Sequence, residues 1–187
     1  PVADEVSVTE IEPELEVESE AKEESVVEET EGYPQYVILG DDADEEILEI
    51  FIEEALEELA SLNEHLPRWI NDSNDEESLM TIRRSFHTLK GSGRLIGAEL
   101  IGEFSWHFEN MLNRVIDKSR PLTQDVYDVL EESLGVLPQL IEQLKGNQEP
   151  IKNVYQLMGK AETLGKWQKP TDEAEDETEI EEAEAEA

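Results

Sequence analysis

Apolar side chains recur every three or four positions along most of the middle of this chain. Between residues 44 and 70 glutamates fill the positions between them, which is the spacing of an amphipathic helix. Similar spacing continues through 73–96, 100–115, 123–146 and, more weakly, 150–164. The pattern therefore predicts four helices and a weaker fifth. The apolar stripe of the first helix consists of Leu48, Phe51, Ile52, Ala55, Leu59, Leu62 and Leu66.

Residues that begin or end helices separate these stretches. Ser73 and Glu76 form a capping-box pattern, which predicts that the second helix begins there. Gly97 predicts the end of that helix, because glycine readily takes the left-handed backbone that closes many helices. Thr123 is the predicted N-cap of the fourth helix, and Pro138 predicts a kink within it.

The predicted fold is all-α, because no stretch alternates convincingly with the two-residue period of a strand. Four amphipathic helices joined by short loops favour an antiparallel four-helix bundle, which we assign to residues 41–147. Residues 148–168 then form an additional C-terminal helix or extension.

Both ends of the chain are strongly acidic. Residues 1–40 hold 13 acidic residues and one basic residue, and residues 171–187 hold 10 acidic residues and no basic one. Segments of this composition bury too little apolar surface to offset the loss of chain entropy on folding. We therefore predict a disordered acidic linker over 1–40 and a disordered acidic tail over 169–187.

Charge and composition exclude several classes of function. The formal net charge of −35 disfavours binding to nucleic acid, to anionic membranes and to a second copy of the chain, so we expect a monomer. The absence of cysteine excludes disulfides and thiolate metal sites. No apolar run is long enough to span a bilayer, which makes a cytoplasmic protein the simplest expectation.

Three histidines are the candidate reactive groups, and one of them has an unusual setting. His65 lies near the end of the first helix, where the helix dipole alone favours a histidine. His107 borders the apolar stripe of the third helix, which is typical of a partly buried structural histidine. His87 follows Phe86 directly, so its side chain points about 100° away from the core and is expected to be partly exposed.

Basic residues gather around His87 in an otherwise acidic domain. Arg83, Arg84, Lys90 and Arg94 lie three, four or seven positions from it, which places them on the same face of the helix. A phosphoryl group carries two negative charges and needs nearby cations. Neutral imidazole is also nucleophilic near physiological pH. This face therefore favours a histidine that carries a phosphoryl group.

Two glycines follow on the same helix. Helical side chains lean towards the N-terminus, so the residue at position 91 should cover the surface over His87, and Gly91 leaves that surface open. Gly93 adds a second small residue nearby. Each costs the helix about 1 kcal/mol relative to alanine, so a reason for both is expected. One reason is access for a partner to the imidazole; the other is close packing between helices.

The string from Phe86 to Ala98, FHTLKGSGRLIGA, resembles the motif of histidine phosphotransfer (HPt) domains, a histidine followed by lysine three residues on and then glycine. The resemblance covers about residues 44–146. Phe108 to Leu112 resembles the third helix of the phosphotransfer domain in chemotaxis-type histidine kinases. The Arg83 to His87 segment resembles large hybrid kinases that serve twitching motility.

This resemblance implies a role for each matching residue. His87 would be phosphorylated on the ring nitrogen far from the backbone, and Lys90 would contact the phosphoryl oxygens. Gly91 would give a receiver domain access to the histidine. Glu109 would hydrogen-bond to the histidine. The chemotaxis-type domains hold a second histidine three residues before that glutamate, where this chain has Trp106.

The resemblance also implies partners: a response-regulator receiver domain and a histidine kinase catalytic domain in a two-component phosphorelay. No cofactor is expected in this chain, and Mg²⁺ would be held by the partner. No Gly-rich nucleotide-binding loop is present, so this chain is not expected to hydrolyse ATP alone and would belong to a larger sensor kinase.

Two other functions compete with the phosphorelay. The chain could be a non-catalytic acidic adaptor that binds a basic or regulatory partner. A carboxylate-bridged metal bundle would need Glu-x-x-His pairs on two helices, and none of the three histidines has one.

Overall fold

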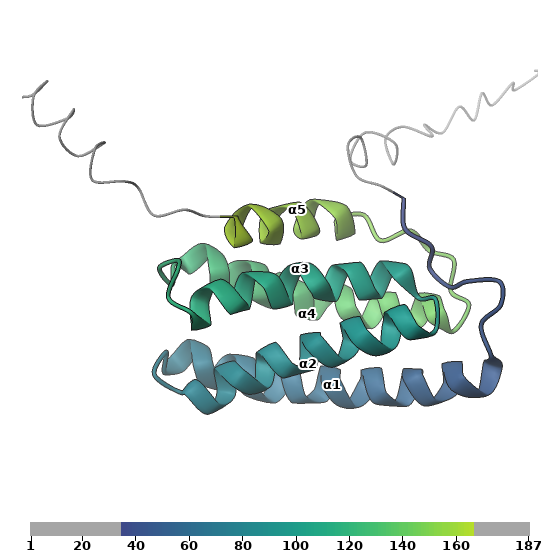
Figure 1. Ribbon diagram of the computed structural model, residues 1–187, viewed down its shortest axis with the longest axis horizontal. Coiled ribbons are helices and arrows are strands. Elements are labelled where there is room, and N and C mark those ends of the chain that lie inside the picture. The colour runs from purple at the N-terminus through teal and green to yellow at the C-terminus, as the bar shows by residue number, and fades with distance from the viewer. Residues whose placement is uncertain (1–34, 167–187) are drawn as a thin grey trace, which may run out of the picture.

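The structure, a computed structural model, describes residues 35–166 and contains five helices over that range (Figure 1). The described residues contain no strand, so the predicted all-α fold is confirmed. No helix in this range is long and apolar enough to cross a membrane. The predicted acidic tail, and the predicted linker up to residue 34, lie outside the described residues. The helices are α1 Glu45–Asn71, α2 Glu76–Leu95, α3 Glu99–Ile116, α4 Gln124–Leu144 and α5 Val154–Gly165.

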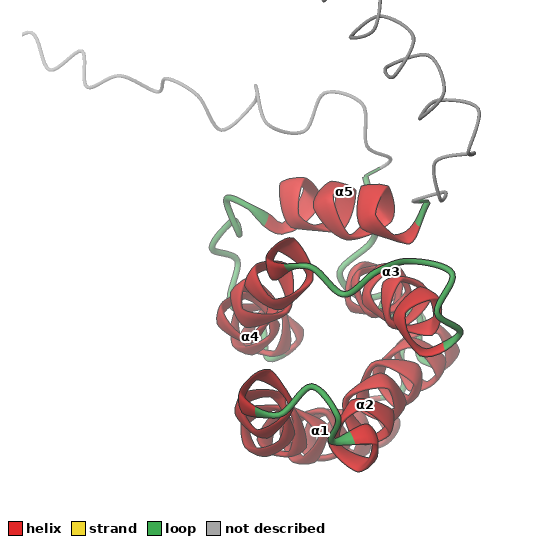
Figure 2. Cartoon of the chain, turned by 90° about the vertical axis from the view of Figure 1, so that its left-hand side faces the viewer, coloured by secondary structure: helices red, strands yellow, loops and turns green. Residues whose placement is uncertain are grey.

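Helices α1 to α4 form the antiparallel bundle that the sequence predicts, and α5 lies across α3 and α4 (Figures 1 and 2). The closest pairs are α1 with α2 and α2 with α3. The core between them contains four large, fully buried aromatic side chains: Trp69, Phe86, Phe104 and Phe108. The rings of Phe86 and Phe108 stack with centroids 5.1 Å apart, which joins α2 to α3 directly behind His87.

Side-chain caps define the start of the first two helices. Asp44 accepts hydrogen bonds from the backbone of Glu46 and Ile47 at the start of α1. Asp75, and not Ser73, caps α2, because its carboxylate accepts from the backbone N–H of Ser78 at 3.0 Å. The predicted capping box is therefore wrong.

Glu76 is the first residue of α2, too early in the helix to take the reciprocal position of a capping box with Ser73. Thr123 occupies the N-cap position of α4 as predicted, but its side chain makes no cap hydrogen bond. Its hydroxyl accepts from Arg120 instead. Helix α4 continues through Pro138 without a break.

The turn between α2 and α3 is closed by Gly97, which has a positive φ of 78° as its predicted role requires. The segment before α1 packs on this turn. Gly40 donates its backbone N–H to Gly97 at 3.0 Å, and Leu100 donates to the carbonyl of Val37 at 2.9 Å. Residues 36–40, which the sequence analysis assigned to the linker, therefore lie against the bundle.

Helix α5 is held to the bundle by a buried arginine. Arg120 follows α3, and its guanidinium donates to the carbonyl of Leu164 near the end of α5 at 2.7 Å. The same guanidinium donates to Pro121 O and Thr123 Oγ1 in the loop before α4. Leu157 and Met158 of α5 are buried, so the predicted extension is an integral part of the fold.

Replacing Arg120 with methionine should therefore destabilise the domain. The variant keeps an apolar stem but leaves the carbonyls of Leu164 and Pro121 without their donor, at a cost of about 1–3 kcal/mol. Urea denaturation measures the loss. Lys118→Met, an exposed change in the same loop, is the control, and equal stability of the two variants would refute the role of the arginine.

Candidate functional site

His87 lies on α2 next to Phe86, and this neighbour determines where the imidazole points. The Phe86 ring is fully buried against α3, so the next side chain along the helix turns outward. The side chain of His87 is 55% exposed, which confirms the predicted exposure. The imidazole is thus held on a helix and open to solvent.

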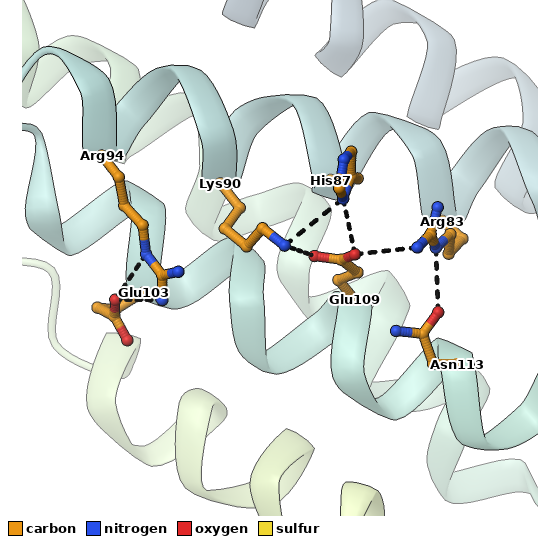
Figure 3. Close-up of polar contacts among 7 residues, drawn as sticks. All are labelled: Arg83, His87, Lys90, Arg94, Glu103, Glu109 and Asn113. Carbon is orange, nitrogen blue, oxygen red and sulfur yellow. Dashed lines mark hydrogen bonds and ion pairs between the residues drawn. The ribbon is translucent and has the colours of Figure 1, made fainter.

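A single carboxylate joins the residues around His87 (Figure 3). Glu109 comes from α3, and its side chain is only 5% exposed. Its Oε1 lies 2.8 Å from His87 Nδ1 and accepts from Arg83 Nη2 at 3.2 Å. Its Oε2 pairs with Lys90 Nζ at 2.6 Å. Three side chains spaced along one face of α2 therefore converge on one side chain of α3.

This contact determines which nitrogen of the imidazole carries the hydrogen. We assign it to Nδ1 of His87, because an ionised carboxylate only accepts hydrogen bonds. Lys90 Nζ lies 3.5 Å from the same nitrogen, but it has Glu109 as its acceptor. The other ring nitrogen, Nε2, then keeps its lone pair.

Glu109 is ionised at neutral pH despite its burial. Burial alone would raise the pKa of this carboxyl, but hydrogen bonds from Lys90 and His87, together with their charges, lower the pKa below its ordinary value. The carboxylate can therefore hold the imidazole in one orientation across the physiological range.

Arg83 is tied to α3 at two points. Besides its bond to Glu109, its Nε donates to Asn113 Oδ1 at 3.0 Å (Figure 3). No motif in the sequence marks Asn113. Its signal is its position, four residues after Glu109 and therefore on the same face of α3.

The four cations predicted to surround His87 divide into two groups. Arg83 and Lys90 lie near the imidazole, as predicted, but both pair with the Glu109 carboxylate beside it. Arg94 pairs instead with Glu103 of α3 at 2.6 Å, farther along α2 (Figure 3). Arg84 is exposed, and among the described residues no ion pair or hydrogen bond engages its side chain. The prediction that all four surround the histidine is therefore corrected.

The other two histidines lie away from this site. His65 Nδ1 lies 3.2 Å from the hydroxyl of Ser78 between α1 and α2. His107 is buried, and burial lowers its pKa. The charges nearest to it include Glu162 and Lys166, at the end of α5, so it faces away from Glu109. Neither histidine contacts His87, and no group of side chains in the described region could hold a metal ion.

A family model for the Hpt domain matches residues 46–147, more than half of the chain. The chain belongs to the Hpt domain family. Helix α5 lies beyond the matched residues, although its buried side chains make it part of the same bundle.

This Hpt domain is similar to part of several chemotaxis proteins. It is 26% identical over 132 residues to CheA of Listeria innocua, which covers 71% of this chain and 21% of that protein. It is 33% identical over 95 residues to CheA of Rhizobium meliloti, which covers 51% of this chain and 12% of that protein. The chain thus spans about a fifth or less of the length of these relatives.

The fold also resembles the crystal structure of the phosphorylated P1 domain of CheA3 in complex with CheY6 from R. sphaeroides. The TM-score is 0.57, and the match covers 64% of this chain and 95% of that chain. The sequences are 16% identical, so this likeness concerns the fold.

The two glycines of the Hpt motif have different surroundings. A Cβ atom on Gly91 would meet nothing within 4 Å, so packing within the domain does not require glycine there. A Cβ on Gly93 would lie 3.3 Å from backbone atoms of Ala98 and Gly102. Gly93 is buried, so of the two reasons expected for a glycine the structure supports the close packing of α2 on α3.

Alanine at each of these positions should separate access from packing. Gly93→Ala should destabilise the Hpt domain by about 1–3 kcal/mol, because the added methyl group would crowd backbone atoms of α3, which can move away only if the helices separate. Gly91→Ala should leave the domain as stable or up to about 1 kcal/mol more stable, since alanine favours the helix. It should nevertheless slow phosphoryl exchange with a receiver, because the added methyl group lies one turn from His87 on the same face of α2.

Thermal unfolding of the two variants tests the first pair of expectations, and exchange kinetics test the third. A Gly91→Ala domain that exchanges phosphoryl groups at the wild-type rate would show that the open surface serves no partner. A Gly93→Ala domain of unchanged stability would show that α2 and α3 can move apart enough to accept a methyl group.

Proposed function

We propose that this Hpt domain carries a phosphoryl group on Nε2 of His87 and exchanges it with the aspartate of a receiver domain or with a histidine kinase catalytic domain. One observation carries the proposal: the exposed imidazole is oriented by a nearly buried carboxylate on Nδ1. This leaves the nucleophilic lone pair on the nitrogen that points away from the bundle.

The transfer step needs charge stabilisation more than covalent chemistry. The lone pair of His87 Nε2 forms a bond to phosphorus, and the bond from phosphorus to the leaving oxygen breaks with its electron pair. The ring keeps the hydrogen on Nδ1 and becomes positively charged. Glu109 lies 2.8 Å from that nitrogen, so its negative charge stabilises the cation as it forms.

Lys90 would stabilise the transferred group. Its ammonium lies 3.5 Å from the ring of His87 on a long flexible stem, and its side chain is partly exposed. A phosphoryl group on Nε2 carries more negative charge than Glu109 and would draw the ammonium towards it. Mg²⁺, where the reaction uses it, would be bound by the partner domain.

The proposed receiver-binding surface extends from His87 along α1 and α2. The P1 domain of CheA3 was crystallised with CheY6, which supports a receiver as the partner of this chain. Leu95 is 84% exposed on α2, and Ile50 is 62% exposed on α1. Ser61 lies opposite Ser85 in this antiparallel pair, so the same register brings the first turns of α1 beside the end of α2. These apolar side chains would be covered by the receiver.

The kinase activity of the parent protein is part of the proposal. The relatives are chemotaxis proteins several times longer than this chain, so a catalytic domain elsewhere in the parent protein would phosphorylate His87 from ATP. The isolated Hpt domain would then be a substrate and a phosphoryl carrier but not an independent enzyme.

Replacing His87 with glutamine tests the carrier role directly. The wild-type domain, incubated with a phosphorylated receiver or with a chemotaxis-type kinase domain and ATP, should gain a label that is labile in acid and stable in alkali. His87→Gln should gain none, and the control His65→Gln should be labelled normally. Label that persists in His87→Gln would move the site elsewhere, and absence of label from several donors would favour the acidic adaptor.

Replacing Glu109 with glutamine tests the carboxylate. The amide has nearly the same shape but no charge to stabilise the imidazolium, so phosphotransfer should slow on the order of a hundredfold. Samples quenched at successive times during transfer to a receiver give the rate. An unchanged rate would mean that the carboxylate has only a structural role.

A further inference from the structure

Arg83 and Asn113 form a clamp on Glu109 that the phosphotransfer chemistry described above does not use. The guanidinium bridges two side chains one turn apart on α3, with Nη2 on Glu109 at 3.2 Å and Nε on Asn113 at 3.0 Å. Its planar shape presents both donors in a fixed geometry. The side chain is 30% exposed, so most of it is covered where α2 packs on α3.

The need for this clamp follows from the position of Lys90. In the unphosphorylated domain Lys90 and Arg83 both pair with Glu109, one on each carboxylate oxygen. When a phosphoryl group on His87 attracts Lys90, Glu109 loses one of these cations. A carboxylate that is only 5% exposed is destabilised when it loses a compensating charge. The positive charge of the phosphorylated ring lasts only while the phosphoryl group is bound, so Arg83 is the cation that stays with Glu109 before, during and after transfer.

We propose that Arg83, held by Asn113, is a positioning residue that keeps Glu109 paired and oriented while Lys90 moves from Glu109 to the phosphoryl group. Arginine suits this role because it does not lose its proton and because two bonds to α3 hold it away from the phosphoryl group. The inference rests on the proposed function, since it requires a phosphoryl group on His87.

The charges around Glu109 support the separate roles of Arg83, which stays with the carboxylate, and Lys90, which moves to the phosphoryl group. The charged and titratable groups that face its carboxylate are Arg83, His87 and Lys90, all from α2. Its neighbour on its own helix is the neutral amide of Asn113, which contacts it through Arg83. Within residues 35–166, removal of Arg83 therefore leaves Lys90 as the one permanent cation paired with the carboxylate, and it would have to serve the phosphoryl group as well.

The first test compares transfer rates of matched variants of this domain with a phosphorylated receiver. Arg83→Gln should slow transfer about tenfold, the effect of losing a hydrogen bond to a charged group. Arg83→Lys should recover part of the rate, because it restores the charge without the second contact. Asn113→Ala should slow transfer less than Arg83→Gln, because the arginine remains but is no longer held.

The control removes a charge close by without touching the clamp. Arg114 is exposed and adjacent to Asn113 on α3, so Arg114→Gln removes the same charge from the same region. Its rate should equal that of the wild type. An equal loss in Arg114→Gln and Arg83→Gln would overturn the proposal, because the effect would then be one of overall charge.

The pH dependence of the transfer rate distinguishes a positioning role of Arg83 from a role in folding alone. Without Arg83 the pKa of Glu109 should rise, so the fall in transfer rate on acidification should begin at a higher pH in Arg83→Gln than in the wild type. Circular dichroism at each pH measures the folded fraction, and in a merely less stable domain the transfer rate would fall only in proportion to that fraction. That outcome, or an unchanged rate in Arg83→Gln, would overturn the proposal.

A measurement without phosphorylation keeps this inference distinct from the proposed function. The ¹³C shift of the Glu109 carboxyl reports its titration in the unphosphorylated domain, and the midpoint should move to higher pH in Arg83→Gln. If no His87 label forms in any assay, the proposed function fails whatever this midpoint does. If wild type is labelled and the Arg83→Gln midpoint does not move, only the clamp fails.

Discussion

The site depends on a carboxylate that is almost entirely removed from water. Glu109 remains ionised because Lys90 and His87 of α2 lower the pKa of its carboxyl, and Arg83 from the same helix also pairs with it. Arginine, histidine and lysine are all common on helix surfaces, so none of the three is unusual by itself. Their convergence on one buried acceptor orients the imidazole, selects its tautomer and holds two cations beside it. The carboxylate thus organises the reactive face, although it forms no bond to phosphorus in the proposed chemistry.

Packing between α2 and α3 makes that convergence possible. The stacked rings of Phe86 and Phe108 join the helices directly behind the site. Towards the end of α2, Gly93 and Gly102 let the backbones approach so closely that a Cβ on either would press on the other helix. Because His87 follows Phe86 and Glu109 follows Phe108, the same stack that forms the core brings the two polar side chains together on its outer side.

The sequence could predict those features that depend on one helix at a time. Spacing along a helix was enough to place His87 on an exposed face and to identify Lys90 as its neighbour, while Glu109 was found only through resemblance to a family. The clamp that Arg83 and Asn113 form on Glu109 was not predicted, because it depends on the register between α2 and α3. The same limit explains Gly93, whose buried contacts come from α3 and not from its own helix.

The face of α2 around His87 is rich in basic residues, whereas the chain as a whole is strongly acidic. Residues 41–170 carry 26 acidic and 13 basic residues, so the average surface repels a phosphoryl group. Four of those basic residues lie on a stretch of α2 from Arg83 to Arg94, and two of them are neutralised only by a carboxylate shared with His87. If His87 accepts a phosphoryl group as proposed, this local excess of basic residues would favour the approach of a phosphorylated partner to α2 over the acidic average surface.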